Sequence, residues 1–268
     1  MYFAYFLAGF LVCLISYHGF RFIETIYARK SGRPFFIHFY PFRASISNQQ
    51  RYILEQRFPF FTKLDFRNKE FFEHRLATFL NEKSFEGREG LEITDELKIL
   101  ISATAIMLTF GMREYMLDLV EKIIIYPTRY YSRFNGEYHI GEFNPKFKAL
   151  VFSWEDFKKG FDVENDNRNL GIHEFAHAIH LSSIKNRDTS STIFSDGFRE
   201  LELMLLDEQL RTKLQGSDYF RDYAFTNKFE FVAVVLENFI ETPNEFRREF
   251  PEVYEKVKRM LNFDYAGY

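Results

Sequence analysis

Two histidines and a glutamate have the spacing of a metal-binding helix. His173, Glu174 and His177 form a His-Glu-x-x-His sequence inside an apolar stretch. On a helix, residues four apart lie on one face about 6 Å apart along the axis, so both imidazoles can bind one Zn²⁺. Glu174 is rotated by roughly 100° from His173 and can act as a general base on water at the metal. A chance match is the alternative, but two buried imidazoles without a partner are energetically costly, which favours the metal site.

A catalytic zinc site also needs a third protein ligand and an open position for water. His180 shares the histidine face but lies a turn too far for the same metal, so we interpret it as pocket lining or a hydrogen-bonded core residue. Glu230 and Glu237 lie seven residues apart in an apolar segment and therefore share one helix face. Either glutamate can be the third ligand, and the other can accept a hydrogen bond from a histidine Nδ1–H.

The elements that position these residues predict an α+β fold, mostly helical with a small sheet. Periodic apolar residues predict helices at residues 47–58, 68–81, 94–110, 170–184, 194–213, 229–241 and 252–261. Short β-branched or aromatic runs predict strands at residues 122–126, 137–143 and 148–154. Helices followed by a small sheet and then by more helices are typical of the α+β class.

Composition excludes several classes of protein. The 268 residues include 35 basic and 38 acidic side chains, and this balance gives no electrostatic footprint for nucleic acid. Hydrophobic residues make up 46% of the chain, which is typical of a globular protein with a sizeable core. Cys13 is the one cysteine, so the chain has neither an intramolecular disulfide nor a cysteine-based zinc site.

The N-terminal residues 2–17 carry no charged side chain, and basic residues follow at Arg21, Arg29, Lys30 and Arg33. A membrane-spanning helix needs about 20 apolar residues, so this run is at the short end of the range. A cleaved signal peptide fits less well, because no basic residue precedes the run. A buried or interfacial helix is the alternative. The positive-inside rule places the rest of the chain in the cytoplasm. We therefore expect a single-pass anchor at residues 1–30 and a cytoplasmic catalytic domain at residues 31–268.

Several segments together carry a resemblance to a known family. They are residues 139–143 (HIGEF), 150–154 (LVFSW), 169–177 (NLGIHEFAH), 230–239 (EFVAVVLENF) and 243–254 (PNEFRREFPEVY). Over roughly residues 91–264 the sequence resembles the Mlc titration factor A family of zinc peptidases, which are gluzincins. The sequence departs from the best-known branch in residues 224–229, which lack an Asp-Pro, and in the N-terminal anchor.

The resemblance implies a zincin-like metallopeptidase domain with particular site residues. It implies that Glu230 is the third ligand beside His173 and His177, and that Tyr223 is a catalytic tyrosine. The phenol of Tyr223 then donates to the oxyanion of the tetrahedral intermediate, while Glu174 is the base. The expected substrate is a peptide or protein, bound by strand addition at a sheet edge formed by residues 148–154, and aminopeptidase activity is one form this reaction can take.

The family name suggests a different function as well. The chain could be a binding module that sequesters a transcriptional regulator, with zinc in a structural role and the regulator as its protein partner. Neither sequestration nor a purely structural zinc needs a base beside the metal. The intact Glu174 therefore favours catalysis.

Overall fold

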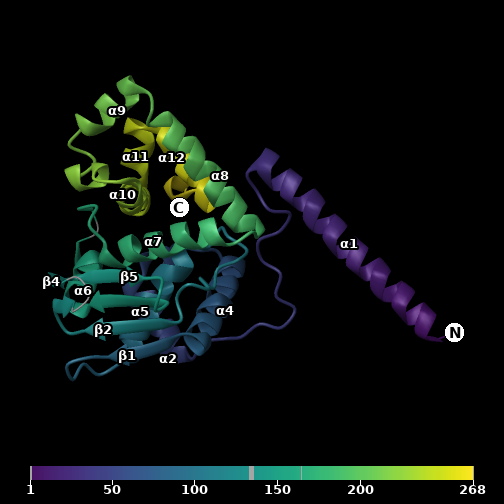
Figure 1. Cartoon of the computed structure of the whole chain (residues 1–268). Helices are drawn as coiled ribbons and strands as arrows, with labels where there is room; N and C mark the ends of the chain where they lie inside the picture. The colour runs from purple at the N-terminus through teal and green to yellow at the C-terminus, as the bar shows by residue number, and fades with distance from the viewer. Residues whose placement is uncertain (1, 133–135, 164, 268) are drawn as a thin grey trace.

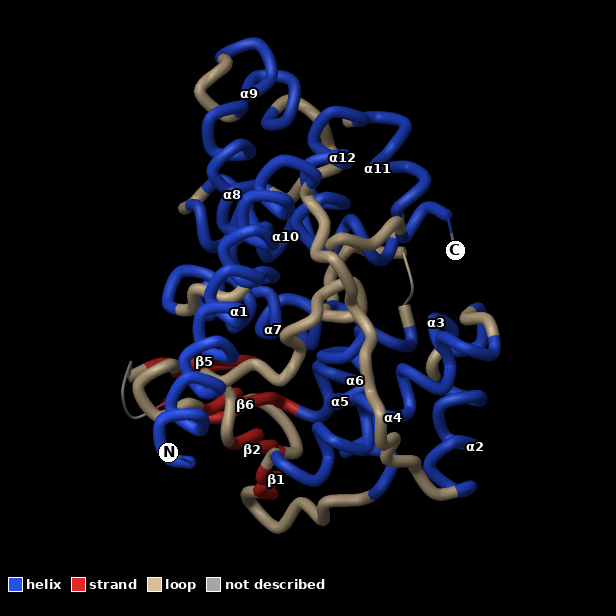
Figure 2. The backbone as a smooth tube through the Cα atoms, turned by 90° about the vertical axis from the view of Figure 1, so that its right-hand side faces the viewer, coloured by secondary structure: helices blue, strands red, loops and turns tan. Residues whose placement is uncertain are grey.

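A small sheet and a layer of helices enclose one long core helix in this protein. The computed structural model describes residues 2–132, 136–163 and 165–267. The helices are α1 Tyr2–Ser31, α2 Asn48–Arg57, α3 Pro59–Lys63, α4 Phe66–Glu82, α5 Asp95–Leu108, α6 Trp154–Asp162, α7 Leu170–Lys185, α8 Thr189–Met204, α9 Glu208–Gln215, α10 Lys228–Glu241, α11 Pro243–Glu249 and α12 Pro251–Leu261, with 3-10 turns η1 Asp222–Phe225 and η2 Tyr265–Gly267. The predicted class, mostly helical with a small sheet, is confirmed (Figures 1 and 2).

The main sheet has four strands in the order β1-β2-β6-β5. Its strands are β1 Ser84–Gly87, β2 Lys122–Tyr126, β6 Ala149–Ser153 and β5 Gly141–Asn144. The first three run parallel, and β5 pairs antiparallel with β6. Ile123 and Ile125 alternate into the core, as the β-branched sequence predicts. A separate hairpin joins β3 Tyr130–Ser132 to β4 Glu137–His139.

Helix α7 lies along the open edge of β5 and packs against α5 on one side and α10 on the other (Figure 1). Both packing partners are strongly apolar: most of α5 is buried, and α10 is buried from Phe231 to Phe239. The His-Glu-x-x-His segment is therefore held between the sheet edge and α10.

Three sequence predictions about these elements are wrong. The predicted strand at residues 137–143 is two strands, because the chain changes partner at Ile140, whose carbonyl accepts from Ser153 N at 2.7 Å. The predicted helix at residues 194–213 is divided into α8 and α9, because the Asp207 carboxylate caps α9 through Gln209 N and Leu210 N. Residues 148–154 do not form a sheet edge, since β6 lies between β2 and β5.

Helix α1 extends away from the rest of the molecule (Figure 1). It is long and apolar enough to cross a membrane. Its buried residues are Glu24 and Ala28, both in the half that packs against α8. The helix ends at Ser31, and Gly32 follows with φ +68°, a left-handed conformation that suits glycine. The division into an anchor at residues 1–30 and a catalytic domain at residues 31–268 stays a prediction.

Candidate metal centre

The start of α7 is fixed by its N-cap residue, Asn169. The side-chain oxygen of Asn169 accepts from Ile172 N at 3.1 Å, and its Nδ2 donates to the Gly160 carbonyl at 2.8 Å. The first bond satisfies a free N–H of the helix end, and the second ties α7 to α6. The apolar side of α7 is buried, with Ile172 and Phe175 in the core. This burial turns the histidine side of α7 towards α10.

His173, His177 and Glu230 converge at this surface. Each of the three offers one ligand atom, and these atoms lie within 4.8 Å of one another. The two Nε2 atoms are 3.2 Å apart, and Glu230 Oε2 is 3.0 Å from His173 Nε2. Glu230 Oε1 is 3.6 Å from His177 Nε2. The structure therefore brings together the three residues for which the sequence predicts a ligand role.

Glu237 lies behind His173 rather than beside this cluster. Its Oε1 is 2.7 Å from His173 Nδ1, on the opposite side of the ring from the Nε2 that faces Glu230. The same oxygen accepts from Arg221 Nη2 at 2.6 Å, and Oε2 accepts from Asn169 N at 2.8 Å. Glu237 is 1% exposed, so its charge depends on these three donors. This geometry fits the outer hydrogen-bond partner of a metal-binding histidine.

The chemistry of the cluster fits a bound cation. The Glu237 carboxylate holds the proton of a neutral His173 on Nδ1, which leaves the Nε2 lone pair pointing at a second imidazole and a carboxylate. Burial opposes a charge on His173, but hydrogen bonds to Glu230 and Glu237 outweigh it and raise its pKa to about 10. Burial and then the charge of His173 lower the pKa of His177. The second proton of His173 thus supplies the positive charge that the two carboxylates favour. A zinc ion would supply that charge instead and suits this nitrogen and oxygen donor set.

Glu174 is buried between α7 and the edge of β5. Burial raises the pKa of its carboxyl to about 7, and the positive charge of His173 opposes the rise. A Cβ added at Gly141 would lie 2.7 Å from Glu174 Oε1, so the glycine permits the close approach of β5. A carboxyl group with a raised pKa beside a metal cluster has the properties of a general acid and base.

Tyr223 lies on η1 at the mouth of the site and is 50% exposed. Its ring centroid is 6.1 Å from that of His173. Burial and the carboxylate of Glu230, which is hydrogen-bonded to the phenol, raise its pKa to about 12. Tyr223 therefore keeps its proton at neutral pH and can donate it in a hydrogen bond. Tyr223, Glu174 and His173 all line one cleft of about 630 Å³ that runs past the edge of β5.

The sequence did not predict the surroundings of His180 or the role of Arg221. His180 is a core residue, but neither ring nitrogen has a hydrogen-bond partner, so the expectation of a hydrogen-bonded histidine is wrong. Its ring lies 4.2 Å from that of Phe198 between centroids, and burial lowers its pKa to about 4. Arg221 was missed altogether. It lies two residues before Tyr223, and nothing in the local sequence distinguishes it from other surface arginines.

Comparison with known proteins assigns this chain to a family. The model of the glucose-regulated metallo-peptidase M90 family matches residues 42–261, which include all of the cluster. The chain belongs to this metallopeptidase family, and the family implies a metal. The resemblance seen in the sequence is thereby confirmed.

Individual relatives share lower identity along most of the chain. An uncharacterized protein of Synechocystis sp. is 24% identical over 229 residues, which cover 77% of this chain and 81% of the relative. Mlc titration factor A of Serratia proteamaculans is 22% identical over 225 residues, covering 77% and 84%. Mlc titration factor A of Cronobacter sakazakii is 26% identical over 200 residues, covering 66% and 72%.

Proposed function

We propose that this protein is a zinc-dependent peptidase with a zincin-like catalytic domain. In this proposal His173, His177 and Glu230 bind Zn²⁺, and Glu174 is the general base. The observation that carries it is the convergence of three ligand atoms within 4.8 Å beside a buried carboxyl group. A structural zinc site needs no such carboxyl group.

The residues of the site suit the hydrolysis of a peptide bond. Bound zinc would supply Lewis-acid chemistry, namely polarisation of a peptide carbonyl and a lowering of the pKa of water towards about 7. A carboxylate oxygen of Glu174 takes a proton from the attacking water and delivers it to the leaving amide nitrogen. The Tyr223 hydroxyl donates a hydrogen bond to the carbonyl oxygen as negative charge develops there. Glu237 holds the Nδ1 proton of His173, so Nε2 stays free to bind the metal.

The open edge of β5 suits an extended substrate. Among the described residues, β5 pairs with β6 on one side and faces the cleft on the other. A peptide that adds to this edge lies across Glu174 and His173, with backbone hydrogen bonds giving affinity independent of sequence. The proposed substrate edge is therefore β5, and not residues 148–154, for which the sequence predicted this role.

Metal analysis combined with a peptide-library cleavage assay tests the peptidase. The purified protein should hold one equivalent of zinc and cleave peptides, lose activity on chelation, and regain it when zinc is added. Stoichiometric zinc with no cleavage of any library member would remove the catalytic proposal and leave a structural or binding role.

A second candidate function is sequestration of a transcriptional regulator. The names of the relatives favour it, because two of them are called Mlc titration factor A. Pull-down of a regulator with and without zinc separates the functions, since sequestration predicts capture by the Glu174→Gln variant equal to that by the wild type. Capture of no regulator by either form would remove this candidate.

We also propose that α1 spans a bilayer and leaves the remaining chain in the cytoplasm. Its length and hydropathy support the span, and the basic residues after it support the orientation. Protease added outside sealed spheroplasts should leave the C-terminal domain intact. Digestion of this domain would reverse the orientation, and a soluble full-length protein would remove the anchor.

A further inference from the structure

We propose that the side of the domain next to α1 is a second membrane contact that rests on the headgroups of an anionic bilayer. This inference rests on the proposed spanning role of α1 and goes beyond it, because an anchor alone leaves the domain free to tilt. We call this surface the anchor-side face. Its residues are Arg21, Phe36, Phe39, Phe42, Lys185 and Arg187.

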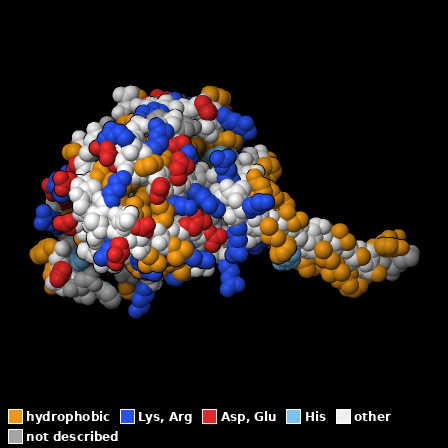
Figure 3. Space-filling view, turned by 90° about the horizontal axis from the view of Figure 1, so that it is seen from above, with side chains coloured by type: hydrophobic (Ala, Val, Ile, Leu, Met, Phe, Trp, Pro, Cys, Tyr) orange, Lys and Arg blue, Asp and Glu red, His pale blue; other side chains and the backbone are white. Residues whose placement is uncertain are grey.

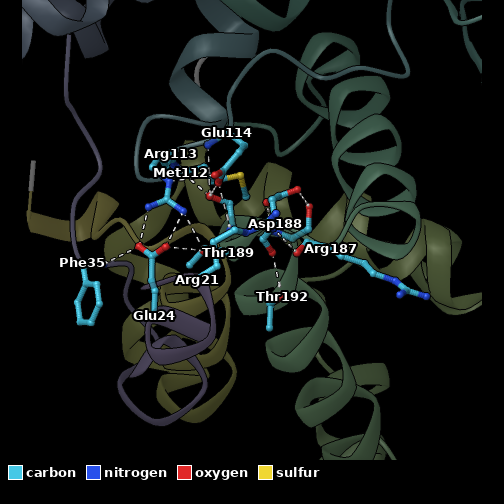
Figure 4. Close-up of polar contacts among 12 residues, drawn as sticks. Arg21, Glu24, Phe35, Met112, Arg113, Glu114, Arg187, Asp188, Thr189 and Thr192 are labelled. Carbon is cyan, nitrogen blue, oxygen red and sulfur yellow. Dashed lines mark hydrogen bonds and ion pairs between the residues drawn. The ribbon is translucent and has the colours of Figure 1, made fainter. Parts of the chain in front are cut away.

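A buried ion pair fixes α1 to the domain. Glu24 on α1 is 2% exposed and accepts from Arg113 Nη1 at 2.6 Å and Nη2 at 3.0 Å. Arg113 Nη2 also donates to Thr189 Oγ1 at 2.8 Å, at the start of α8 (Figure 4). Glu24 further accepts from Phe35 N at 3.4 Å, which ties in the segment that follows α1. These bonds hold α1, the linker and α8 in one arrangement, since breaking them leaves a buried charge unpaired.

The free length of α1 sets the level of the bilayer surface. Residues 2–20 rise about 28 Å as a helix, close to the roughly 30 Å of a hydrocarbon core. Arg21 then falls at the interface. Its Nη2 donates to the Arg187 carbonyl at 3.3 Å, so the corner between α7 and α8 is at the same level (Figure 4). Lys185 and Arg187 are therefore at headgroup depth.

Exposed phenylalanines lie on the same side. The linker after α1 descends along the flank of the domain that faces α1 (Figure 1). Along it Phe39 is 72% exposed, Phe42 is 90% exposed and Phe36 is 41% exposed. The Cζ atom of Arg113 lies 4.7 Å from the centroid of the Phe36 ring. Single exposed apolar residues are ordinary, but phenylalanines at every third position beside a membrane-crossing helix can bury their rings at the headgroup boundary.

The charge of the face suits anionic lipid. Among the described residues, Arg21, Lys185 and Arg187 form no ion pair with a carboxylate. Of the acids nearby, Glu114 forms an ion pair with Arg113, and Asp188 caps the start of α8 by accepting from Ser191 N. Figure 3 shows basic side chains gathered where α1 leaves the domain and apolar ones along its free length. Unpaired basic side chains at this depth attract phosphatidylglycerol or phosphatidylserine headgroups.

The contact would hold the metal centre near the membrane. His177 and Lys185 lie eight residues apart on α7, which is about 12 Å along the helix axis. A domain resting on this face therefore keeps its cleft at a fixed height, within reach of polypeptide segments close to the bilayer. A domain on a flexible tether would hold its cleft at no fixed height above the bilayer.

Spin labels on the full-length protein in vesicles test the contact. Native Cys13 carries a label that reports on α1 itself. Cys13→Ser with Phe39→Cys or Phe42→Cys places the label on the face. In the same Cys13→Ser background, Leu206→Cys in the turn between α8 and α9 gives a similarly exposed apolar control. In vesicles containing phosphatidylglycerol, labels at 39 and 42 should collide severalfold more with oxygen than with a nickel chelate, whereas the label at 206 should show the reverse.

Charge reversal tests the lipid chemistry with a matched control. Arg187→Glu should move the label at Phe39 towards water in phosphatidylglycerol vesicles but not in pure phosphatidylcholine, and Arg211→Glu on α9 should have no effect. If the labels at 39 and 42 are in water while the label at Cys13 is in lipid, the second contact is wrong and only the anchor remains. An aqueous Cys13 would remove the anchor itself. Shielding of the face labels from both reagents in detergent would mean that protein covers the face, and the proposal would fail.

Discussion

The two late glutamates should respond differently to substitution, because one faces the ligand cluster and the other lies behind it. Glu230 offers a carboxylate oxygen 3.0 Å from His173 Nε2, whereas Glu237 contacts the same ring at Nδ1. Glu230→Ala removes a direct ligand and should abolish stoichiometric zinc binding. Glu237→Gln keeps the shape of the side chain and removes its charge, so it should weaken binding without emptying the site.

The size of the Glu237 effect follows from its contacts. Oε1 accepts from both His173 and Arg221, and Oε2 accepts from Asn169 N. A glutamine has one acceptor oxygen, so its amide group must face a donor and at least one bond is lost. A hydrogen bond to a charged group contributes about 1.5–3 kcal/mol. Outer-partner substitutions typically weaken metal binding about 10–100-fold, or about 1.4–2.7 kcal/mol, in agreement with this value.

Competition titration with a chromophoric chelator measures both variants directly. The expected order of zinc affinity is wild type, then Glu237→Gln, then Glu230→Ala, with Glu230→Ala retaining no stoichiometric metal. If Glu237→Gln loses its metal and Glu230→Ala keeps it, the assignment of Glu230 as ligand is wrong, and the role of Tyr223 falls with it.

Three further predictions concern the surroundings of the cluster. Tyr223→Phe should leave zinc content unchanged and lower kcat by about 10²-fold because an oxyanion donor is lost; unchanged kinetics would remove the tyrosine from the reaction. Zinc binding to the metal-free protein at pH 8 should release a proton, since the pKa of His173 is raised to about 10, and calorimetry in buffers of different ionisation enthalpy measures it. His180→Leu should keep zinc and retain or raise the melting temperature at pH 7, because a buried imidazole without a partner is replaced. The pKa of His180 is about 4 in the folded protein and about 6.5 in the unfolded chain, so protonation as the pH falls favours unfolding. Between pH 7 and pH 5 the free energy of unfolding of the wild type should therefore fall by about 2 kcal/mol more than that of the leucine variant. Equal decreases in the two proteins would contradict this.

Local patterns in the sequence predicted most of the helices and the shared face of the two histidines. The His-Glu-x-x-His residues lie on one helix, so the relative placement of the two imidazoles depends on helix geometry alone and not on the packing of other elements. Thr94 and Asn169 stand directly before apolar runs and cap α5 and α7, a position that suits their short polar side chains. The choice between Glu230 and Glu237 was different, because it depends on how α10 packs against α7. The resemblance predicted that choice and periodicity did not.

The errors come from contacts between residues far apart in the chain. The edge of the sheet could not be predicted, because strand order depends on long-range pairing that places β6 inside and β5 outside. Gly141 and Arg221 were missed for the same reason: each matters through its contact with Glu174 or Glu237, and neither contact is local. The assignment of metal ligands and of Tyr223 as a catalytic residue stays a prediction.

Metal content and peptide hydrolysis measured together on wild type and Glu174→Gln test the central claim most directly. The substitution removes the proposed base and leaves the three proposed ligands, so the variant should hold one zinc per chain and lose about 10²–10⁴-fold in rate. A variant that retains zinc and cleaves peptides at the wild-type rate would contradict the proposed role of Glu174 and with it the mechanism.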